Sequence, residues 1–484
     1  MARPRGANRR GRHGVVDGAD RTLHPRHGGP PMGPARGLGW RHGPREGLGP
    51  VHQEADPGRL RGRRRDASRA GGFCPLRFVS DRLDISETRR AAFKSPSPFQ
   101  RGVRPALLYH DDFLKYDFGP AHALREIRVK LARDLIAGYG LLGDRGAEEL
   151  RPSPAAEADI LTVHRPEYVA TVRELGADPH GSSEVHGLGT VDDPVFAGMY
   201  EASALQVGAT LRACSEVASG RRLRAFNLGG GFHHAMPDRA SGFCIFNDIA
   251  IGIRSLLDQH QVRRILYVDI DAHHGDGVQA VFYEDPRVLT ISLHEDGHYL
   301  FPGTGFTDEI GAGDGKGFAV NVPLPPYTRD VSYLYAFQEV VPPIARAFRP
   351  DLICSQLGAD AHYLDPLTHL MLTTETYEAV GRILDGLSSE LCGGRWIAVG
   401  GGGYDVTAVP RVWTVLFATM VGLRLDDALP TNWLREGNRL VGTVPAEKAL
   451  RDHTKVDEDA HVPRQVKRTV EELRRLVFPI HGIR

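Results

Sequence analysis

Short, largely apolar runs alternate with longer amphipathic stretches from about residue 103 onward. The apolar runs lack the polar alternation of half-exposed strands, so they predict strands that are buried on both faces, as in a parallel sheet. We expect these strands at Arg104–Tyr109, Leu223–Leu228, Ile265–Ile270, Val288–Leu293, Leu352–Leu357 and Trp396–Val399. Helical spacing predicts helices at Ala123–Tyr139, Asp248–Gln259, Ser332–Ala347 and Thr374–Leu391. The alternation predicts an α/β fold with a central, mostly parallel sheet flanked by helices.

The two ends of the chain differ from this central part. Residues 1–70 contain 16 Arg, no Lys and 6 acidic residues, a charge of +10 in a chain whose formal net charge is +0. They also hold 14 Gly and 8 Pro, and no Ile, Phe or Tyr. Such a segment buries too little apolar surface to offset its chain entropy, so we expect residues 1–102 to form a disordered extension. We expect one globular domain at residues 103–430 and a helical, charged tail at 431–484, with an amphipathic helix at Val466–Val477.

Composition excludes several classes of protein. The chain contains no run of about 18 apolar residues, so the sequence predicts no transmembrane helix. The Arg-rich start lacks the apolar core of a secretory signal. Five scattered cysteines without a C-x-x-C pair indicate neither a disulfide framework nor a cysteine zinc site, so we expect a protein of the reducing cytoplasm. Zero net charge argues against a globally basic nucleic-acid binder. The Arg-rich segment leaves open a contact with nucleic acid or another acidic surface, beside the simpler interpretation that it has no role.

Polar side chains and glycines follow five of the predicted strands. In a parallel sheet the carboxyl ends of the strands bind ligands, so these segments predict one shared polar cleft. The segments are Gly229–His234, Asp271–Asp276, His294 with Phe301–Gly305, Gly358–Asp360 and Gly400–Tyr404.

The segment Asp269-Ile270-Asp271-Ala272-His273 predicts a metal site. Alternate residues of a strand share one side, and carboxylate and imidazole groups bind Zn²⁺, Fe²⁺, Mn²⁺ or Co²⁺. Asp360 is the natural third ligand from a separate strand, and three protein ligands leave a position for water, as in catalytic sites. The alternative is a capping aspartate and an inert buried histidine.

Two neighbouring histidines and a tyrosine indicate acid–base chemistry beside this cluster. Histidine ordinarily titrates near neutral pH, which suits His233 and His234 to acid–base catalysis, and Asp269 and Asp276 are available to orient them. Tyr404 follows four glycines and could donate a hydrogen bond to a developing oxyanion. The alternatives are a core and a surface histidine, and a tyrosine that only packs a turn.

These blocks, taken together, resemble the zinc-dependent histone deacetylase family. The resemblance is carried by Gly229–Pro237, Ala240–Asp248, Tyr267–Gly277, Gln356–Asp360, Asp365-Pro366 and Gly400–Tyr404, over about Val103 to Leu425. Further blocks at Tyr116–Pro120, Gly187–Thr190 and Tyr299–Gly305 are similar to the bacterial acetoin-utilisation branch of that family.

The resemblance implies a single arginase/deacetylase-type domain and a role for each site residue. It implies zinc, with iron as the alternative, on Asp271, His273 and Asp360, and the pairs His233–Asp269 and His234–Asp276. It places Gly242, Phe243 and Phe301 along a substrate tunnel, Asp193 or alternatively Asp192 at its rim, and Arg128 in an inner acetate channel. It also implies structural potassium on Asp269, Asp271, His273, Ser292 and Leu293; Phe318, where the family often has Tyr, puts a second potassium site in doubt.

The implied activity is hydrolysis of acetyl-lysine on a protein, such as an acyl-CoA synthetase, in acetoin or acetate metabolism. Alternatives are an acetylpolyamine amidohydrolase, a catalytically silent acyl-lysine-binding domain and an arginase-like enzyme with two manganese ions. The arginase-like alternative needs paired acidic residues on the later strand, where Gly358 stands two residues before Asp360. The sequence does not assign an oligomeric state.

Overall fold

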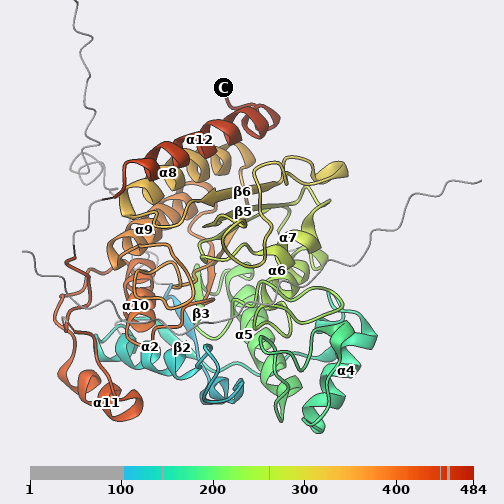
Figure 1. Ribbon diagram of the computed structural model, residues 1–484, viewed down its shortest axis with the longest axis vertical. Helices are drawn as coiled ribbons and strands as arrows, with labels where there is room; N and C mark the ends of the chain where they lie inside the picture. Colours follow the sequence, from blue (N-terminus) through green and yellow to red (C-terminus); the bar gives the residue numbers. More distant parts are fainter. Residues whose placement is uncertain (1–102, 144–145, 261, 447, 455–457) are drawn as a thin grey trace, which may run out of the picture. The chain divides into compact units, whose positions relative to one another are not determined.

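A parallel sheet forms the centre of the molecule (Figure 1). The computed structural model describes residues 103–143, 146–260, 262–446, 448–454 and 458–484, and the extension expected at 1–102 lies outside them. The sheet has eight strands in the order β2-β1-β3-β8-β7-β4-β5-β6, and each neighbouring pair is parallel. The predicted α/β fold with a central sheet is therefore confirmed.

The strands follow the predicted apolar runs closely. They are β1 (Ala106–Leu108), β2 (Glu148–Leu150), β3 (Arg224–Asn227), β4 (Ile265–Asp269), β5 (Val288–Glu295), β6 (Ala319–Leu324), β7 (Leu352–Gln356) and β8 (Trp396–Val399). The sequence analysis missed the two edge strands. β2 has only three residues, two of them Glu, and the pattern of β6 is broken by Asn321 and by Pro323, a residue that edge strands tolerate.

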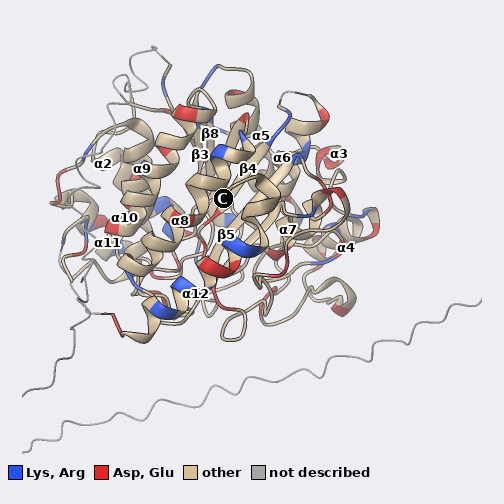
Figure 2. Ribbon diagram, turned by 90° about the horizontal axis from the view of Figure 1, so that it is seen from above, with Lys and Arg blue, Asp and Glu red and all other residues tan. Residues whose placement is uncertain are grey.

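Two layers of helices cover the sheet, as Figures 1 and 2 show from two directions. One layer contains α2 (Ile127–Gly138), α8 (Asp330–Phe348), α9 (Thr374–Leu391), α10 (Ala408–Val421) and α12 (His461–Leu476). The other contains α4 (Pro166–Ala177), α5 (Met199–Ala218), α6 (Asp248–Asp258) and α7 (Asp276–Phe282). The short α3 (Glu157–Ile160) lies near α5 and α6, and α11 (Thr431–Val441) lies against α2.

Helix ends are set by side-chain caps and by turns. Thr373 caps α9 where expected, and Asn247 caps α6 through the N–H of Ala250, 2.9 Å away. α2 begins only at Ile127, four residues after the predicted start, because the chain from Gly119 onward forms turns first. α5 and α10 were not predicted, because most of their residues are buried and they lack the broad polar stripe of an amphipathic helix.

The C-terminal helix belongs to the same hydrophobic core as the sheet. α12 begins at His461, five residues before the helix that the sequence predicted. It buries Val462, Val466, Val470 and Leu473 against α8 and β6. The spacing of four, four and three residues places these side chains on one face, as an amphipathic helix requires.

Two further expectations from the sequence concern membrane-spanning helices and disulfides. None of the helices in this part of the chain is long and apolar enough to cross a membrane. The cysteines it contains are buried and form no disulfide; they are Cys214, Cys244, Cys354 and Cys392.

Strand order brings the predicted polar loops together. β3, β8, β7, β4 and β5 are consecutive in the sheet, and all are parallel. Their carboxyl ends therefore meet at one edge, and the five segments singled out in the sequence gather there.

We predict that Leu473→Ala lowers the free energy of unfolding by about 2–5 kcal/mol, the usual cost of truncating a fully buried leucine. Leu473 is 0% exposed in the core, whereas Leu476, one turn later, is 36% exposed. Chemical denaturation of both alanine variants checks the prediction, and Leu476→Ala should change stability by about 0.5 kcal/mol or less. Equal, small effects would contradict the assignment of α12 to the core.

Candidate active site

Three candidate metal ligands come from the ends of two paired strands. Asp271 and His273 follow β4, and Asp360 follows β7, the neighbour of β4. One ligand atom from each residue lies within 4.8 Å of the others. The Nδ1 atom of His273 is 3.1 Å from Asp271 Oδ1 and 2.9 Å from Asp360 Oδ2. The fold thus brings the predicted trio together.

The charge and chemistry of this cluster fit a divalent cation. Two carboxylates and an imidazole are the ligands that zinc and iron accept in catalytic sites. Asp271 and Asp360 are 1% and 0% exposed, so two negative charges meet where water is largely excluded. Burial and the charge of Asp271 raise the pKa of Asp360 well above its usual range. A bound cation would offset this excess negative charge.

Backbone and amide donors hold the two carboxylates in place. Asp271 Oδ2 accepts hydrogen bonds from Gln356 Nε2 at 2.6 Å and from the N–H of Gly402 at 2.7 Å. Asp360 Oδ1 accepts one from the N–H of Ala272 at 2.7 Å. Such partners fix the orientation of metal ligands.

The position of Gly358 argues against the arginase-like alternative. A Cβ atom there would collide with the Asp271 carboxylate, so the backbone leaves no room for any side chain. A second acidic ligand two residues before Asp360 is therefore excluded by packing as well as by sequence.

Two histidine–aspartate pairs lie beside the cluster. His233 Nδ1 is 2.8 Å from Asp269 Oδ2, and His234 Nδ1 is 2.7 Å from Asp276 Oδ1. The two imidazole rings are 4.0 Å apart between centroids, and His233 Nε2 lies 3.9 Å from Asp271 Oδ1. Both pairs are those expected from the sequence, and their Nε2 atoms are left for chemistry.

The two histidines differ in their electrostatic surroundings. Burial opposes protonation of His233, but the carboxylates of Asp269 and Asp271 outweigh it and raise its pKa to about 9. Burial and the neighbouring His233 lower the pKa of His234 to about 4, despite Asp276. The surroundings of His233 therefore favour its protonated form, and those of His234 favour its neutral form.

Tyr404 shares a cavity with the histidines, and a buried aspartate fixes its backbone. Asp365 Oδ2 accepts the N–H of Tyr404 at 2.8 Å. Burial raises the pKa of Asp365 to about 7 and, together with the charges of Asp360 and Asp271, the pKa of Tyr404 well above its usual range. Tyr404 thus keeps its hydroxyl proton at neutral pH.

Aromatic rings surround the approach to the cluster. The Phe243 ring makes an edge contact with Tyr404 at 5.6 Å, and Phe301 makes one with His234 at 5.0 Å. Phe243 has a φ of 69°, a strained value for a side chain of this size. The hydroxyl of Tyr116 donates to its carbonyl oxygen at 2.8 Å and holds this conformation. Gly242 allows the close approach, since a Cβ atom there would collide with His234 and Phe301.

The structure corrects the expected rim residue. The side chain of Asp193 is buried, and burial together with the charge of Asp192 raises its pKa to about 8. Since only 3% of Asp193 is exposed, its carboxylate is poorly placed to contact a substrate at the rim. Asp192, the alternative, is exposed, and its carbonyl oxygen contacts His122, whose ring packs on Phe243. The exposed carboxylate beside the tunnel is therefore that of Asp192.

Arg128 lies inside the molecule, beneath the glycine run. Its Nη1 donates to the carbonyl oxygens of Gly401 and Gly403 at 2.7 and 2.8 Å, and its guanidinium lies 5.3 Å from the ring centre of Trp413. The predicted channel arginine is thus buried next to the site, where it supports the loop that carries Tyr404.

The predicted potassium ligands are also neighbours. Ser292 pairs with Asp269 across the β4–β5 ladder, and its Oγ lies 2.8 Å from His294 Nδ1. Potassium binding stays a prediction, because these contacts do not distinguish it from an ordinary polar core.

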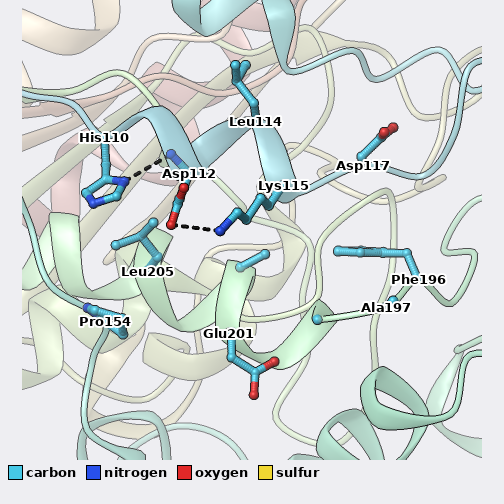
Figure 3. Close-up of a pocket in the computed structure, with 12 residues that line it drawn as sticks. His110, Asp112, Leu114, Lys115, Asp117, Pro154, Phe196, Ala197, Glu201 and Leu205 are labelled. Carbon is cyan, nitrogen blue, oxygen red and sulfur yellow. Dashed lines mark hydrogen bonds and ion pairs between the residues drawn. The ribbon is translucent and has the colours of Figure 1, made fainter.

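Asp271 and the two histidines line a narrow cavity of about 20 Å³, which Arg128, Phe243 and Tyr404 also line. This volume is close to that of a single water site. A wider hollow of about 780 Å³ lies elsewhere, between the segment His110–Asp117 and α5 (Figure 3). Figure 3 shows an Asp112–Lys115 ion pair there, 3.0 Å long, and none of the predicted site residues. Chemistry, rather than cavity size, therefore identifies the site.

Three supporting residues were not assigned a role from the sequence. All three lie in blocks that carry the family resemblance, but the hydrogen bonds of Gln356 to Asp271 and of Asp365 to Tyr404 appear only in three dimensions. Tyr267 donates its hydroxyl to Asp269 Oδ2 at 2.5 Å. Its position two residues before Asp269 on the same side of β4 was the available signal.

Comparison with known proteins first defines the class of this protein. Residues 122–420 match the family model described as the histone deacetylase domain. The chain belongs to the histone deacetylase family.

Particular relatives narrow this assignment. The chain is 46% identical over 330 residues to the acetoin utilization protein AcuC of Bacillus subtilis (strain 168), covering 68% of this chain and 84% of that protein. It is 38% identical over 341 residues to AcuC of Staphylococcus aureus (strain MSSA476), covering 70% and 87%. The expected resemblance to the acetoin-utilisation branch is thereby confirmed.

Solved structures agree with the fold. An HDAC homolog from Aquifex aeolicus matches with a TM-score of 0.69 and 32% identity, over 76% of this chain and 99% of that chain. An HDAC homolog complexed with SAHA gives the same values.

We predict that Asp360→Asn weakens binding of a divalent metal by more than about 100-fold, because it removes a charged ligand. Loss of a residue that only hydrogen-bonds a ligand costs roughly 10–100-fold in metal affinity. Metal content after dialysis, measured with added Zn²⁺, checks this. Asp296→Asn, at the same edge but outside the cluster, is the control. Equal zinc retention in both variants would exclude Asp360 as a ligand.

Proposed function

We propose that this protein is a zinc-dependent deacetylase that hydrolyses acetyl-lysine on a protein. The observation that carries the proposal is the position of the His233–Asp269 pair, whose Nε2 lies 3.9 Å from the predicted ligand Asp271 inside a narrow cavity. A metal-type cluster and acid–base groups at this separation can act on one substrate atom together.

Asp271, His273 and Asp360 would hold the zinc ion, with iron as the alternative metal. A bound zinc ion supplies Lewis acidity, which polarises an amide carbonyl and lowers the pKa of water from about 15.7 towards 7. The rest of the chemistry belongs to the side chains around it.

The histidine pair moves the protons. The Nε2 atoms of His233 and His234 face the cavity because Asp269 and Asp276 hold the two Nδ1 atoms. Together they take a proton from the attacking water and return one to the leaving amine. The products are acetate and a free amine.

Tyr404 stabilises the charge that develops on the carbonyl oxygen. Its protonated hydroxyl donates a hydrogen bond, and its backbone is held in advance by Asp365. A donor that is already in place costs no reorganisation during the reaction.

The shape of the approach favours a long, thin substrate. Phe301 lies against His234 and Phe243 lies against Tyr404, so an aliphatic stem such as that of lysine would pass beside apolar rings. Asp192 lies beside this approach and can accept backbone N–H groups of a peptide. We therefore propose a protein substrate; given the AcuC relatives, an acyl-CoA synthetase in acetate or acetoin metabolism is the favoured candidate.

We expect hydrolysis of an acetyl-lysine peptide that stops when a chelator removes the metal and returns when Zn²⁺ is added back. Release of acetate at equal peptide concentration measures it. Acetylspermidine, tested in parallel, distinguishes a small-molecule amidohydrolase with the same metal chemistry. A zinc-loaded, folded protein that cleaves neither compound would refute deacetylation and leave a silent acyl-lysine-binding domain.

We predict that Tyr404→Phe lowers kcat by about 10²–10³-fold, because it removes the oxyanion donor while keeping the ring. Zinc content and thermal stability should stay at the wild-type values. Tyr299→Phe is the matched control, since Tyr299 is 58% exposed near the same edge. A Tyr404→Phe enzyme with wild-type kcat would rule out the oxyanion role.

A further inference from the structure

Asp452 is a buried carboxylate that comes from outside the residues matched by the family model, 122–420. Its Oδ2 atom accepts hydrogen bonds from His362 Nε2 at 2.9 Å and from the N–H of Thr374 at 3.0 Å. Its Oδ1 atom accepts one from Arg411 Nη1 at 2.7 Å. We call these four residues the Asp452 cluster. It joins the loop after β7, the start of α9 and the first turns of α10.

On one side, the Asp452 cluster is connected through His362 to the predicted metal ligand Asp360. His362 follows Asp360 by two residues, and its Nδ1 accepts the N–H of Leu364 at 3.2 Å. The N–H of Asp365 donates to the carbonyl oxygen of His362 at 2.8 Å. His362 therefore lies at the centre of a turn with a metal ligand at one end and the anchor of Tyr404 at the other.

Through Arg411, the Asp452 cluster is also connected to the loop that carries Tyr404. Arg411 Nε donates to the carbonyl oxygen of Thr407 at 3.0 Å. The N–H groups of Thr407 and Ala408 both donate to Asp405 Oδ1 at 2.8 Å. Asp405 directly follows Tyr404, so Arg411 fixes the turn in which the tyrosine loop ends.

The segment that carries Asp452 is itself fastened to the domain. The N–H of Leu450 donates to the carbonyl oxygen of Asp427 at 2.7 Å, and the N–H of Arg451 donates to the Asp427 carboxylate at 2.8 Å. Arg451 also pairs with Glu378 of α9 at 2.8 Å. Asp452 thus rests on a fixed base, as a positioning group must.

We propose that Asp452 is a positioning residue for the active site, which holds Asp360 through His362 and Tyr404 through Arg411. The carboxylate acts from a distance, since each connection ends on a residue that touches the reaction. Its effect on turnover rests on the proposed function, whereas its effect on the two loops does not.

The test compares Asp452→Asn with a matched control. Asn keeps the size of the side chain but replaces an acceptor oxygen with a donor facing His362 or Arg411. Asp385→Asn is the control, because Asp385 pairs with the buried Arg224 at the amino end of β3, away from the site. Each variant loses an ion pair with a buried arginine, so both should show a lowered Tm.

Local effects separate the two variants. In Asp452→Asn we expect amide hydrogen exchange to rise about tenfold or more in residues 359–373 and 400–408, because the cluster no longer restrains local opening. We expect kcat for an acetyl-lysine peptide to fall about 10–100-fold with little change in KM, because small displacements at the reacting centre act on the transition state. Asp385→Asn should show neither effect.

A second variant covers a failure of Asp452→Asn to fold. Arg411→Lys keeps the charge beside Asp452 but cannot also reach Thr407, since lysine lacks the forked guanidinium. It should raise exchange in residues 400–408 and lower kcat in the same way.

Two results would overturn the proposal: exchange in both segments that matches Asp385→Asn, or raised exchange with unchanged kcat. If the wild-type protein itself has no deacetylase activity, zinc affinity measured against a chelator replaces kcat. A weaker zinc affinity in Asp452→Asn alone then supports the positioning role, and equal affinity in all variants refutes it.

Discussion

Burial of carboxylates at one edge of the sheet is the constraint on which this site depends. Asp269, Asp271 and Asp360 are each at most 1% exposed, and a buried charge costs several kcal/mol unless partners offset it. Asp269 receives the hydroxyl of Tyr267 and the ring of His233 on the same oxygen. The His233 ring therefore helps to stabilise the buried charge of Asp269, and Asp269 in turn orients the His233 ring.

Backbone N–H groups also help to stabilise the buried carboxylates. Their close approach explains why glycines surround the cluster. The N–H of Gly402 reaches Asp271, and a Cβ atom at Gly402 would collide with the Asp360 carboxylate. A residue with a side chain could not bring its backbone so close. The glycine run that ends at Tyr404 thus serves two purposes. It brings a backbone N–H group to the Asp271 carboxylate, and it places the Tyr404 hydroxyl in the same cavity.

Local patterns predicted most of the fold and the central residues of the site. β4, β7 and β8 matched their apolar runs, and the candidate ligands Asp271, His273 and Asp360 follow directly from where β4 and β7 end. The sequence favoured Asp193 over Asp192 at the rim, but adjacent carboxylates in a loop share one local pattern, which does not show which of them is exposed. The fold buries Asp193 and leaves its neighbour Asp192 exposed, a difference that depends on packing and not on the local sequence.

Distant carboxylates also explain how loops without secondary structure of their own can form a precise site. Glu295 of β5 accepts the N–H of His369 at 2.7 Å, and Asp330 of α8 accepts the N–H of Thr373 at 2.8 Å. A carboxylate suits this task because its two oxygens can accept several N–H groups at once, and such charge-assisted bonds are roughly twice as strong as neutral ones. Since each such group lies on a different element, the anchors for the loops are spread along the chain. A pattern read within one segment cannot reveal them, and for this reason the reacting residues were easier to predict than the residues that hold them.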